Sequence, residues 1–205
     1  MPQIELHQST KISSNLVQHD FINPGFSWKI GQYCVLSLSS EEKLYLAIAS
    51  HPSEKTLKFI VPKTSKLSEH LSKTEPVYCD APAGNGFNHD LFNHPSIIAI
   101  SHGTGISAIR PVLLEAQKKN KPPVLFYGCK DESEYPTGTE YSEVSPLIAY
   151  SKSAQKHVQD LITDYSFSEP DKIGVFLVGS NEFQDSVTDE LIKKGFAKEH
   201  ISKNF

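Results

Sequence analysis

Residues 96–114 read Ser-Ile-Ile-Ala-Ile-Ser-His-Gly-Thr-Gly-Ile-Ser-Ala-Ile-Arg-Pro-Val-Leu-Leu, and this stretch decides the fold. The isoleucine-rich run from Ile97 to Ile100 predicts a buried parallel strand. After the turn at residues 103–105, the apolar spacing becomes helical. Two glycines leave the backbone open to a ligand, and the first N–H groups of a helix point toward that position. The stretch therefore predicts a strand, a glycine turn and a helix that together form a phosphate site.

A Gly-Thr-Gly turn on its own leaves two interpretations open. Glycine pairs also close strand-to-helix turns for steric reasons alone, with no ligand involved. The choice between the two interpretations depends on the rest of the chain.

The second half of the chain alternates strand and helix patterns, which is typical of a parallel sheet with crossover helices. Glycines stand at the ends of three of the expected strands, at Gly103, Gly128 and Gly179. Ligands bind beyond the carboxyl ends of strands in open parallel sheets, so these glycines favour a nucleotide-binding unit. The expected strands are Ile97–Ser101, Val124–Gly128, Leu147–Tyr150 and Val175–Gly179, and the expected helices are Ser107–Lys119, His157–Tyr165 and Phe183–Lys194.

The first half, to about residue 93, has short alternating segments separated by turn residues. Six strands in about ninety residues indicate a small antiparallel barrel or sandwich. One brief helix is expected at Ser65–Ser72. The expected strands are Ile4–Ile12, Leu16–Ile22, Tyr33–Leu38, Leu44–Ala49, Leu57–Val61 and Val77–Cys79. The chain thus predicts two domains, at residues 1–93 and 94–205.

The composition limits the class of protein and its partners. The chain has 205 residues, 38% of them hydrophobic, and a net charge of −4 with no block of like charges. These values argue against nucleic acid or an acidic membrane as a partner. No apolar run is long enough to span a membrane and the N-terminus lacks a signal pattern, so we expect a cytoplasmic protein.

Cysteine and arginine usage restrict the possible sites further. Cys34, Cys79 and Cys129 are widely spaced in apolar segments, so we expect reduced buried thiols and no metal site. Arg110 is the only arginine. An anion that is normally held by a forked guanidinium must here use Arg110, lysines or backbone N–H groups.

An ordered set of motifs resembles the ferredoxin-NADP reductase superfamily over residues 4–205. It looks most like the small branch that includes the kiwi-type fruit protein and its plastid FAD/NAD(P)-binding relatives. The motifs are Gly31-Gln32-Tyr33, Leu46-Ala47-Ile48-Ala49-Ser50, Ser68 with Leu71, Gly84-Asn85-Gly86-Phe87, Gly103-Thr104-Gly105-Ile106, Tyr127-Gly128, Val178-Gly179 and the terminal Asn204-Phe205.

This resemblance implies a six-stranded flavin-binding β-barrel, followed by a Rossmann-like α/β domain that binds NADH or NADPH. It implies hydride transfer between the nicotinamide and FAD, with FMN as a weaker alternative, and then electron transfer to an unknown acceptor. The cofactor-binding residues that we expect are Leu46, Ala47, Ile48, Ala49, Ser50, Ile60, Val61, Lys63, Ser68, Gly84, Asn85, Gly103, Thr104, Gly105, Ile106, Tyr127, Gly128, Cys129, Gly179, Ser180 and Phe205. The motifs identify no acid or base as catalytic.

The chain also departs from the superfamily's pattern. Leu44, Leu46 and Ala47 stand where the family's Arg-x-Tyr-Ser motif holds the flavin, and Val178 replaces a cysteine beside the nicotinamide. Without the arginine, a diphosphate would depend on backbone amides near residues 65–68 and on lysines such as Lys63. Loss of one bidentate contact weakens binding by about 10- to 100-fold.

Several single residues have more than one interpretation. Strand alternation places Tyr45 on the opposite face from Leu46, which argues against its stacking on a flavin. Phe205 is either a ring-stacking residue or a frayed end. His102 beside the glycine turn is expected to have no function, whereas the Thr104 hydroxyl is expected to contact the nucleotide. Arg110 either contacts phosphate or faces solvent.

The segment from Lys130 to Tyr135 bears on the choice of nucleotide. Its three acids, Asp131, Glu132 and Glu134, would repel a 2′-phosphate and suit a free ribose hydroxyl, so it favours NADH. A solvated loop is the other interpretation. For the whole chain, the alternative to a reductase is a pseudo-reductase, which keeps the fold, has a degenerate flavin site and acts as a nucleotide-binding or partner protein.

Overall fold

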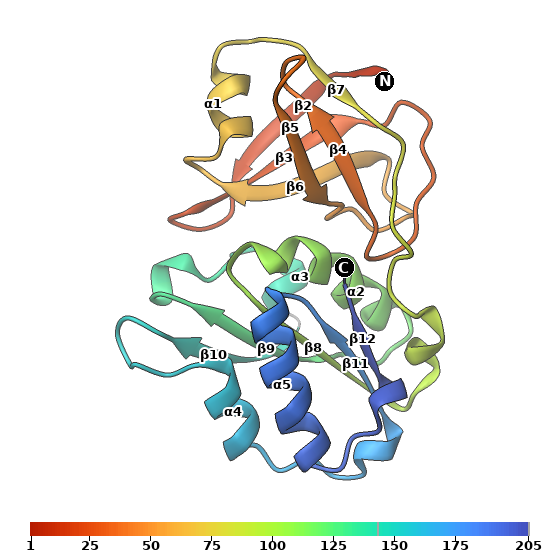
Figure 1. Cartoon of the computed structure of the whole chain (residues 1–205), viewed down its shortest axis with the longest axis vertical. Helices are drawn as coiled ribbons and strands as arrows, with labels where there is room; N and C mark the ends of the chain where they lie inside the picture. Colours follow the sequence, from red (N-terminus) through yellow and green to blue (C-terminus); the bar gives the residue numbers. More distant parts are fainter. Residues whose placement is uncertain (143, 205) are drawn as a thin grey trace.

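The computed structural model describes residues 1–142 and 144–204, which form an antiparallel part above a three-layered α/β part (Figure 1). The antiparallel strands end at Cys79, and the parallel sheet begins at Ser96. A short 3-10 helix, η1 (His89–Asn93), lies in the connection between them. The predicted boundary at residues 93/94 falls in this connection, and the division into domains stays a prediction.

The antiparallel part contains two sheets and one short helix. A four-stranded sheet has the order β1-β7-β4-β5, and a three-stranded sheet has the order β2-β3-β6. The elements are β1 (Gln3–Ile4), β2 (Leu6–Lys11), β3 (Leu16–Ile22), β4 (Tyr33–Ser37), β5 (Lys43–Ala47), β6 (Thr56–Pro62), α1 (Lys66–Ser72) and β7 (Val77–Cys79).

The predicted first strand, Ile4–Ile12, is wrong as a single element. The strand is interrupted at Glu5, and the two pieces join different sheets: β1 pairs with β7, whereas β2 pairs with β3. The predicted strand Leu44–Ala49 also ends early, at Ala47. Ile48 and Ala49 leave the ladder because their N–H groups donate to Gln32 (3.0 Å) and Lys58 (2.8 Å). Among the described residues β5 pairs with β4 alone, so its other edge is open.

Side-chain alternation along β4 and β5 separates the core of the antiparallel part from its surface. Cys34 and Leu36 are fully buried, and their partners Leu46 and Leu44 pack against the same core. Tyr45 points the other way and is 69% exposed. The expectation that Tyr45 and Leu46 lie on opposite faces is confirmed.

The α/β part is built on a parallel sheet with the order β10-β9-β8-β11-β12. The alternating pattern of strands and helices in the second half correctly predicts this architecture. The elements are β8 (Ser96–His102), η2 (Gly103–Gly105), α2 (Ile106–Lys118), β9 (Val124–Cys129), η3 (Glu132–Glu134), α3 (Thr139–Ser142), β10 (Ser145–Tyr150), α4 (Val158–Asp164), η4 (Pro170–Lys172), β11 (Ile173–Leu177), α5 (Asn181–Lys193), η5 (Lys198–His200) and β12 (Ile201–Lys203).

The edge strand β12 was not expected from the sequence. It has three residues, one of them a charged lysine. A segment of this length is too short for an alternation of apolar and polar residues to be recognised. The strand exists because it pairs with β11 in register, Val175 with Ile201 and Leu177 with Lys203.

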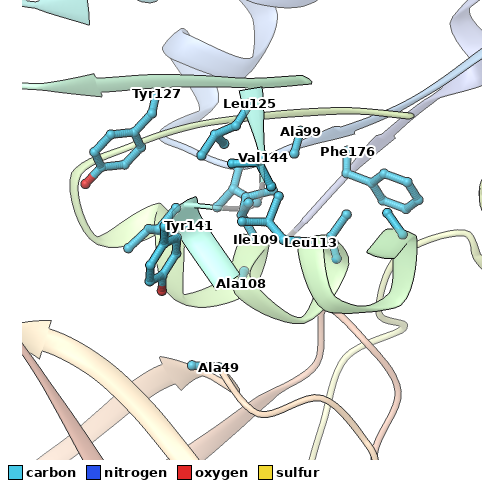
Figure 2. Packing of buried hydrophobic residues seen from close by; sticks show 14 of the residues in the cluster. Ala49, Ala99, Ala108, Ile109, Leu113, Leu125, Tyr127, Tyr141, Val144 and Phe176 are labelled. Atoms are coloured by element: carbon cyan, nitrogen blue, oxygen red, sulfur yellow. The ribbon is translucent and has the colours of Figure 1, made fainter. Parts of the chain in front are cut away.

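The two faces of the parallel sheet pack against different helices. Ala99, Leu125 and Phe176 pack with α2 residues, whereas Ile98 and Phe126 pack on the face covered by α4 and α5. Figure 2 shows the first of these clusters, with Ala49 reaching it from the antiparallel part. The α2 helix therefore lies between the sheet and the antiparallel part.

Gly174 on β11 provides a test of this packing. A Cβ atom on Gly174 would lie 2.5 Å from the Leu91 carbonyl oxygen. We expect Gly174→Ala to lower the free energy of unfolding by about 1–3 kcal/mol, because backbone atoms must shift to remove the overlap. Urea denaturation measures the change, and Ser96→Ala at an exposed position of the same sheet is the control. Equal urea midpoints for the wild-type protein and Gly174→Ala would contradict the close packing of Gly174 on Leu91.

Candidate functional site

A cavity of about 420 Å³ lies at the carboxyl ends of β8, β9 and β10. We call it the first cavity. It brings together five of the predicted site residues: Gly103, Thr104, Tyr127, Gly128 and Cys129. Asn15, in the turn before β3, and Leu16, the first residue of β3, contribute to its wall, so the cavity lies where the antiparallel part meets the parallel sheet.

The glycine turn forms the floor of the first cavity. Gly103 has φ +51°, and a Cβ atom there would meet nothing within 4 Å, so open space lies in front of the turn. The turn is held from behind by Tyr127, whose hydroxyl donates to the Gly103 carbonyl at 2.8 Å. Gly105 packs closely on Ser101 and Val178. No side chain caps the start of α2, which leaves that end available to an anion.

Ile106 lies directly after this turn as the first residue of α2. Its side chain is fully buried in the core, and its N–H donates to the carbonyls of Gly103 and Thr104. Of the four residues predicted in this motif, Gly103 and Thr104 line the first cavity, whereas Gly105 and Ile106 support the turn from within.

The end of β9 shapes the side of the first cavity. A Cβ atom on Gly128 would lie 3.0 Å from Val158 and 3.2 Å from His102, so glycine keeps these walls together. Burial, with the nearby Glu134 and Asp131, raises the pKa of the Cys129 thiol to about 12. Cys129 is therefore a neutral thiol at pH 7, and it serves as cavity wall rather than as a nucleophile.

Gly179 and Ser180 lie beside the first cavity and have structural roles. A Cβ atom on Gly179 would lie 2.3 Å from the Phe183 ring and 3.1 Å from His102. The Ser180 hydroxyl accepts from the Phe183 N–H at 3.3 Å and caps α5. His102 does line the cavity, and burial lowers its pKa, so its ring is neutral at pH 7.

One wall of the first cavity is charged, and only its Lys130–Tyr135 segment was predicted to face a nucleotide. Lys130, Glu134, Lys156 and His157 all line it, although they come from two separate loops. Of the three acids expected to repel a phosphate, Glu134 is the one that reaches the wall, while Asp131 caps η3. A cluster of polar residues between Ser151 and Gln159 is the signal that could have indicated this wall.

The predicted flavin segment at residues 46–50 is held mainly through its backbone. Ala47 is half-buried at the end of β5, whereas Ile48, Ala49 and Ser50 are buried. The Ser50 hydroxyl accepts from the Lys58 N–H at 2.6 Å. It is therefore occupied within the protein and is not directed at the open edge of β5.

The predicted flavin-binding residues on and after β6 differ in burial and in hydrogen bonding. Ile60 and Val61 are buried, and the Lys63 side chain is exposed at the end of β6. The Ser68 hydroxyl is engaged by His19 Nε2 and by Ser65 Oγ, both at 3.0 Å.

Gly84 and Asn85 are exposed in the loop after β7. Gly84 has φ +85°, and its carbonyl accepts from Gln32 Nε2 at 2.7 Å. Asn85 lines a second cavity, of about 720 Å³, with Trp28 and Phe87. Phe205 lies outside the described residues, but the adjacent Asn204 is held by the Leu177 carbonyl and by Gln184.

The expectation that Arg110 contacts phosphate or faces solvent is wrong. Its side chain is buried, and it forms two hydrogen bonds with Glu54 (2.7 and 3.1 Å) and one with Glu140 (2.7 Å). It also donates to the Ala49 carbonyl at 2.8 Å. One turn earlier on α2, Ser107 Oγ donates to the Ala47 carbonyl at 3.0 Å. The helix that follows the glycine turn therefore holds both ends of the segment from Ala47 to Ala49.

The arrangement fits a nicotinamide nucleotide better than it fits a diphosphate-bearing flavin. The first cavity offers an open glycine turn, an uncapped helix and polar walls. Among the described residues β5 is paired along one edge, and Ala47 at its end is small and half-buried. Of the side-chain donors expected at the flavin diphosphate, the motif's arginine is replaced by Leu44 and the Ser68 hydroxyl is already paired, whereas Lys63 is exposed.

Comparison with solved structures defines the fold. A ferredoxin NADP+ reductase from Neisseria gonorrhoeae, with bound FAD and NADP, superposes with TM-score 0.79 at 13% identity, covering 100% of this chain and 98% of that chain. The flavohem-like FAD/NAD-binding domain of nitric oxide dioxygenase from Vibrio cholerae gives 0.80 at 16% identity, covering 98% and 96%. The chain therefore has the ferredoxin reductase-like fold, and the predicted fold class is confirmed.

Sequence comparison adds distant relatives, one of which is a sulfhydrogenase subunit. The chain is 24% identical over 160 residues to the sulfhydrogenase 2 subunit gamma of Pyrococcus furiosus, and the match covers 76% of this chain. The matched region spans 54% of that relative, about half of its length. No family model matches the chain. Among the described residues, no helix is long and apolar enough to cross a membrane, and no cluster suited to a metal ion was found.

Removal of the Arg110 guanidinium tests its place between the two parts. We expect Arg110→Met to lower the free energy of unfolding by about 3–5 kcal/mol at pH 7, because Glu54 and Glu140 lose their buried partner. Burial alone would raise the pKa of Glu54, but the hydrogen bonds and charge of Arg110 outweigh burial and lower it.

The pH dependence of this loss has a defined sign. A lowered carboxyl pKa contributes stability above the ordinary glutamate pKa of about 4.3, and this stability disappears as the pH falls through the folded-state value. The difference in unfolding free energy between wild type and Arg110→Met should therefore shrink on acidification. If this difference in unfolding free energy stayed constant from about pH 7 to about pH 3, the range over which carboxyl groups titrate, the ion pair of Arg110 with Glu54 would not be its cause. Lys203→Met, at an exposed ion pair, is the control.

Proposed function

We propose that this protein is an NAD(P)H-dependent flavin oxidoreductase. The observation that carries the proposal is the first cavity, where an open glycine turn and an uncapped helix lie at the carboxyl ends of three parallel strands. Open parallel sheets bind nucleotides at this position. The same helix contacts the predicted flavin segment, so the two expected ligands would meet across α2.

The chain's own residues would bind and orient the nucleotide. Backbone N–H groups at Gly103 and Thr104 would take the pyrophosphate, and Gly128 would let the nucleotide lie close to β9. A flavin bound along the open edge of β5 would supply the hydride-accepting ring. Ala47, fixed by Ser107, would set the distance of that ring from the nicotinamide, since catalysis of this kind depends mainly on position.

The fold and the relatives support finer assignments within this proposal. The solved relatives include a ferredoxin NADP+ reductase with FAD and NADP, which supports FAD as the flavin and an electron-transfer protein as the acceptor. The motifs at residues 46–50 and 84–87 support placement near the kiwi-type and plastid branch. A cytoplasmic location and the absence of nucleic acid partners remain predictions from composition.

A second candidate function is a pseudo-reductase that binds a nucleotide and acts through a partner protein. It is favoured by one observation, the loss of all three side chains of the flavin motif at Leu44, Leu46 and Ala47. The two functions are separated by mixing the purified protein anaerobically with flavin and NADH or NADPH. Bleaching of the flavin absorbance supports the oxidoreductase, and unchanged absorbance with both nucleotides supports the pseudo-reductase.

The glycine turn can be tested by substitution. We expect Gly103→Val to reduce nucleotide affinity by at least ~10-fold, because the side chain would project into the open space in front of the turn. Nucleotide binding is measured by calorimetry. Gly25→Val is a matched control, since Gly25 also has a positive φ and open surroundings but lies on a distant turn of the antiparallel part. Equal losses in both variants would show that strain rather than position is responsible.

The charged wall allows a paired test of nucleotide choice. We propose that Glu134 disfavours the 2′-phosphate of NADPH while Lys156 favours it, so both nucleotides serve as donors. Glu134→Gln should raise the NADPH-to-NADH ratio of kcat/KM about fivefold, equivalent to roughly 1 kcal/mol, and Lys156→Gln should lower it by a similar factor. Steady-state kinetics measures both ratios. If both variants shifted the NADPH-to-NADH ratio of kcat/KM in the same direction, the 2′ position of the ribose would not lie at this wall.

A further inference from the structure

The flavin side of the molecule lacks the arginine of the family's motif and has its Ser68 hydroxyl already paired, and we infer that flavin is an exchangeable substrate of this protein rather than a resident cofactor. The inference rests on the proposed function and specifies its substrate class: the isoalloxazine–ribityl part of any flavin, with the phosphates contributing little to affinity. Riboflavin, FMN and FAD should then bind alike.

The first argument comes from the hydroxyl and amide donors near α1. The Ser65 N–H donates to the Pro62 carbonyl, and the Ser68 N–H donates to the Ser65 hydroxyl. The Ser68 hydroxyl is bonded to His19 and Ser65. A diphosphate would have to break these bonds before it could use these donors, so the net free energy that they contribute to its binding is small.

The second argument comes from positive charge. Residues 1–93 contain no arginine, and burial lowers the pKa of His19, so that ring is neutral at pH 7. Lys58 is paired with Asp20 at 2.7 Å, and Lys66 with Glu42 at 2.5 Å. Arg110 is buried against Glu54 and Glu140. Charges that are already neutralised by carboxylates attract a phosphate weakly. Lys63, exposed just after β6, forms no ion pair among the described residues, so a phosphate here would meet a flexible lysine and not the forked guanidinium of the family's motif.

The third argument is that the expected ring position is kept while the phosphate position is lost. Ala47 and Ala49 are fixed by Ser107 and Arg110, through carbonyls that belong to the backbone and do not depend on the missing motif. The open edge of β5 remains beside them. The backbone along which a flat ring would lie is therefore held in place without the side chains of the missing motif.

The reaction of an exchangeable flavin balances without a further reagent. NAD(P)H transfers a hydride, which carries two electrons, to the oxidised flavin, and one proton from water completes the reduced flavin. The products are NAD(P)+ and reduced flavin, and both leave. Reduced flavin would then carry the electrons to its acceptor by diffusion.

Equilibrium binding of riboflavin, FMN and FAD to the full chain tests the inference. Quenching of flavin fluorescence gives each Kd, and we expect the three values to agree within about threefold. FAD binding about 100-fold tighter than riboflavin, or FAD that stays with the protein through dialysis, would overturn the inference and leave the proposed function intact. Binding of none of the three would overturn both.

A gain-of-function variant tests the missing charge directly. Leu44 lies on β5, half-buried at the open edge. Leu44→Arg should tighten FAD binding roughly tenfold and leave riboflavin binding nearly unchanged, because the guanidinium can reach only a ligand that carries phosphates. Lys43→Arg, at an exposed neighbouring position, is the matched control.

The outcomes of the variant experiment are distinct. If Leu44→Arg tightened binding of FAD and riboflavin equally, or if only Lys43→Arg tightened FAD binding, the missing arginine at position 44 would not be the reason for weak phosphate binding. Circular dichroism checks that Leu44→Arg is folded, because Leu44 packs against the core of the antiparallel part. If that variant does not fold, the comparison of the three flavins with the wild-type chain decides the inference by itself.

Discussion

The buried guanidinium of Arg110 is the interaction on which the relation between the two parts of this molecule depends. It lies on α2, one turn and a half after the glycine turn, and it neutralises Glu54 and Glu140 while donating to the Ala49 carbonyl. Desolvating three charged groups is unfavourable unless they remain together, so the contact tolerates little displacement. The first cavity and the segment from Ala47 to Ala49 are therefore held in one rigid relation.

This constraint explains why a single helix serves both sides of the candidate site. The N-terminus of α2 faces the first cavity, and its apolar side packs on the parallel sheet (Figure 2). Its remaining side binds the end of β5 through Ser107 and the connection between β5 and β6 through Arg110. A ligand at the glycine turn and a ring at the end of β5 would thus be positioned by the same rigid body, which is what transfer of a hydride over a short distance requires.

The two sides differ in how they would recognise a ligand. The first cavity has charged and polar walls from separate loops in addition to its backbone turn. Strand β5 carries Leu44, Leu46 and Ala47 where the flavin motif would stand, and the Ser68 hydroxyl near α1 is used to bind His19. Such a division would make the nucleotide the specifically recognised ligand and leave the flavin recognised by shape, which is the physical basis for proposing that it is exchangeable.

The fold was predictable because its signals are local. The Ile97–Ile100 run, the glycine turn and the helical spacing after it indicate a strand, a turn and a helix within one short segment, and β8, η2 and α2 follow that order. Much of the first cavity was also predictable, since parallel strands bring their carboxyl ends to one edge, and the glycines at 103 and 128 mark that edge.

The predicted site was less accessible to sequence reasoning where partners come from distant segments. By itself, the sequence determined the two architectures, the position of the glycine turn and the loss of the flavin motif at Leu44 and Leu46. Only the tertiary structure decided that Arg110 is buried, that Lys156 reaches the cavity wall and that Ser68 is already paired with His19. Periodicity reports which way a side chain faces within its own element, but its charge and hydrogen bonds are set by neighbours that only folding brings into contact.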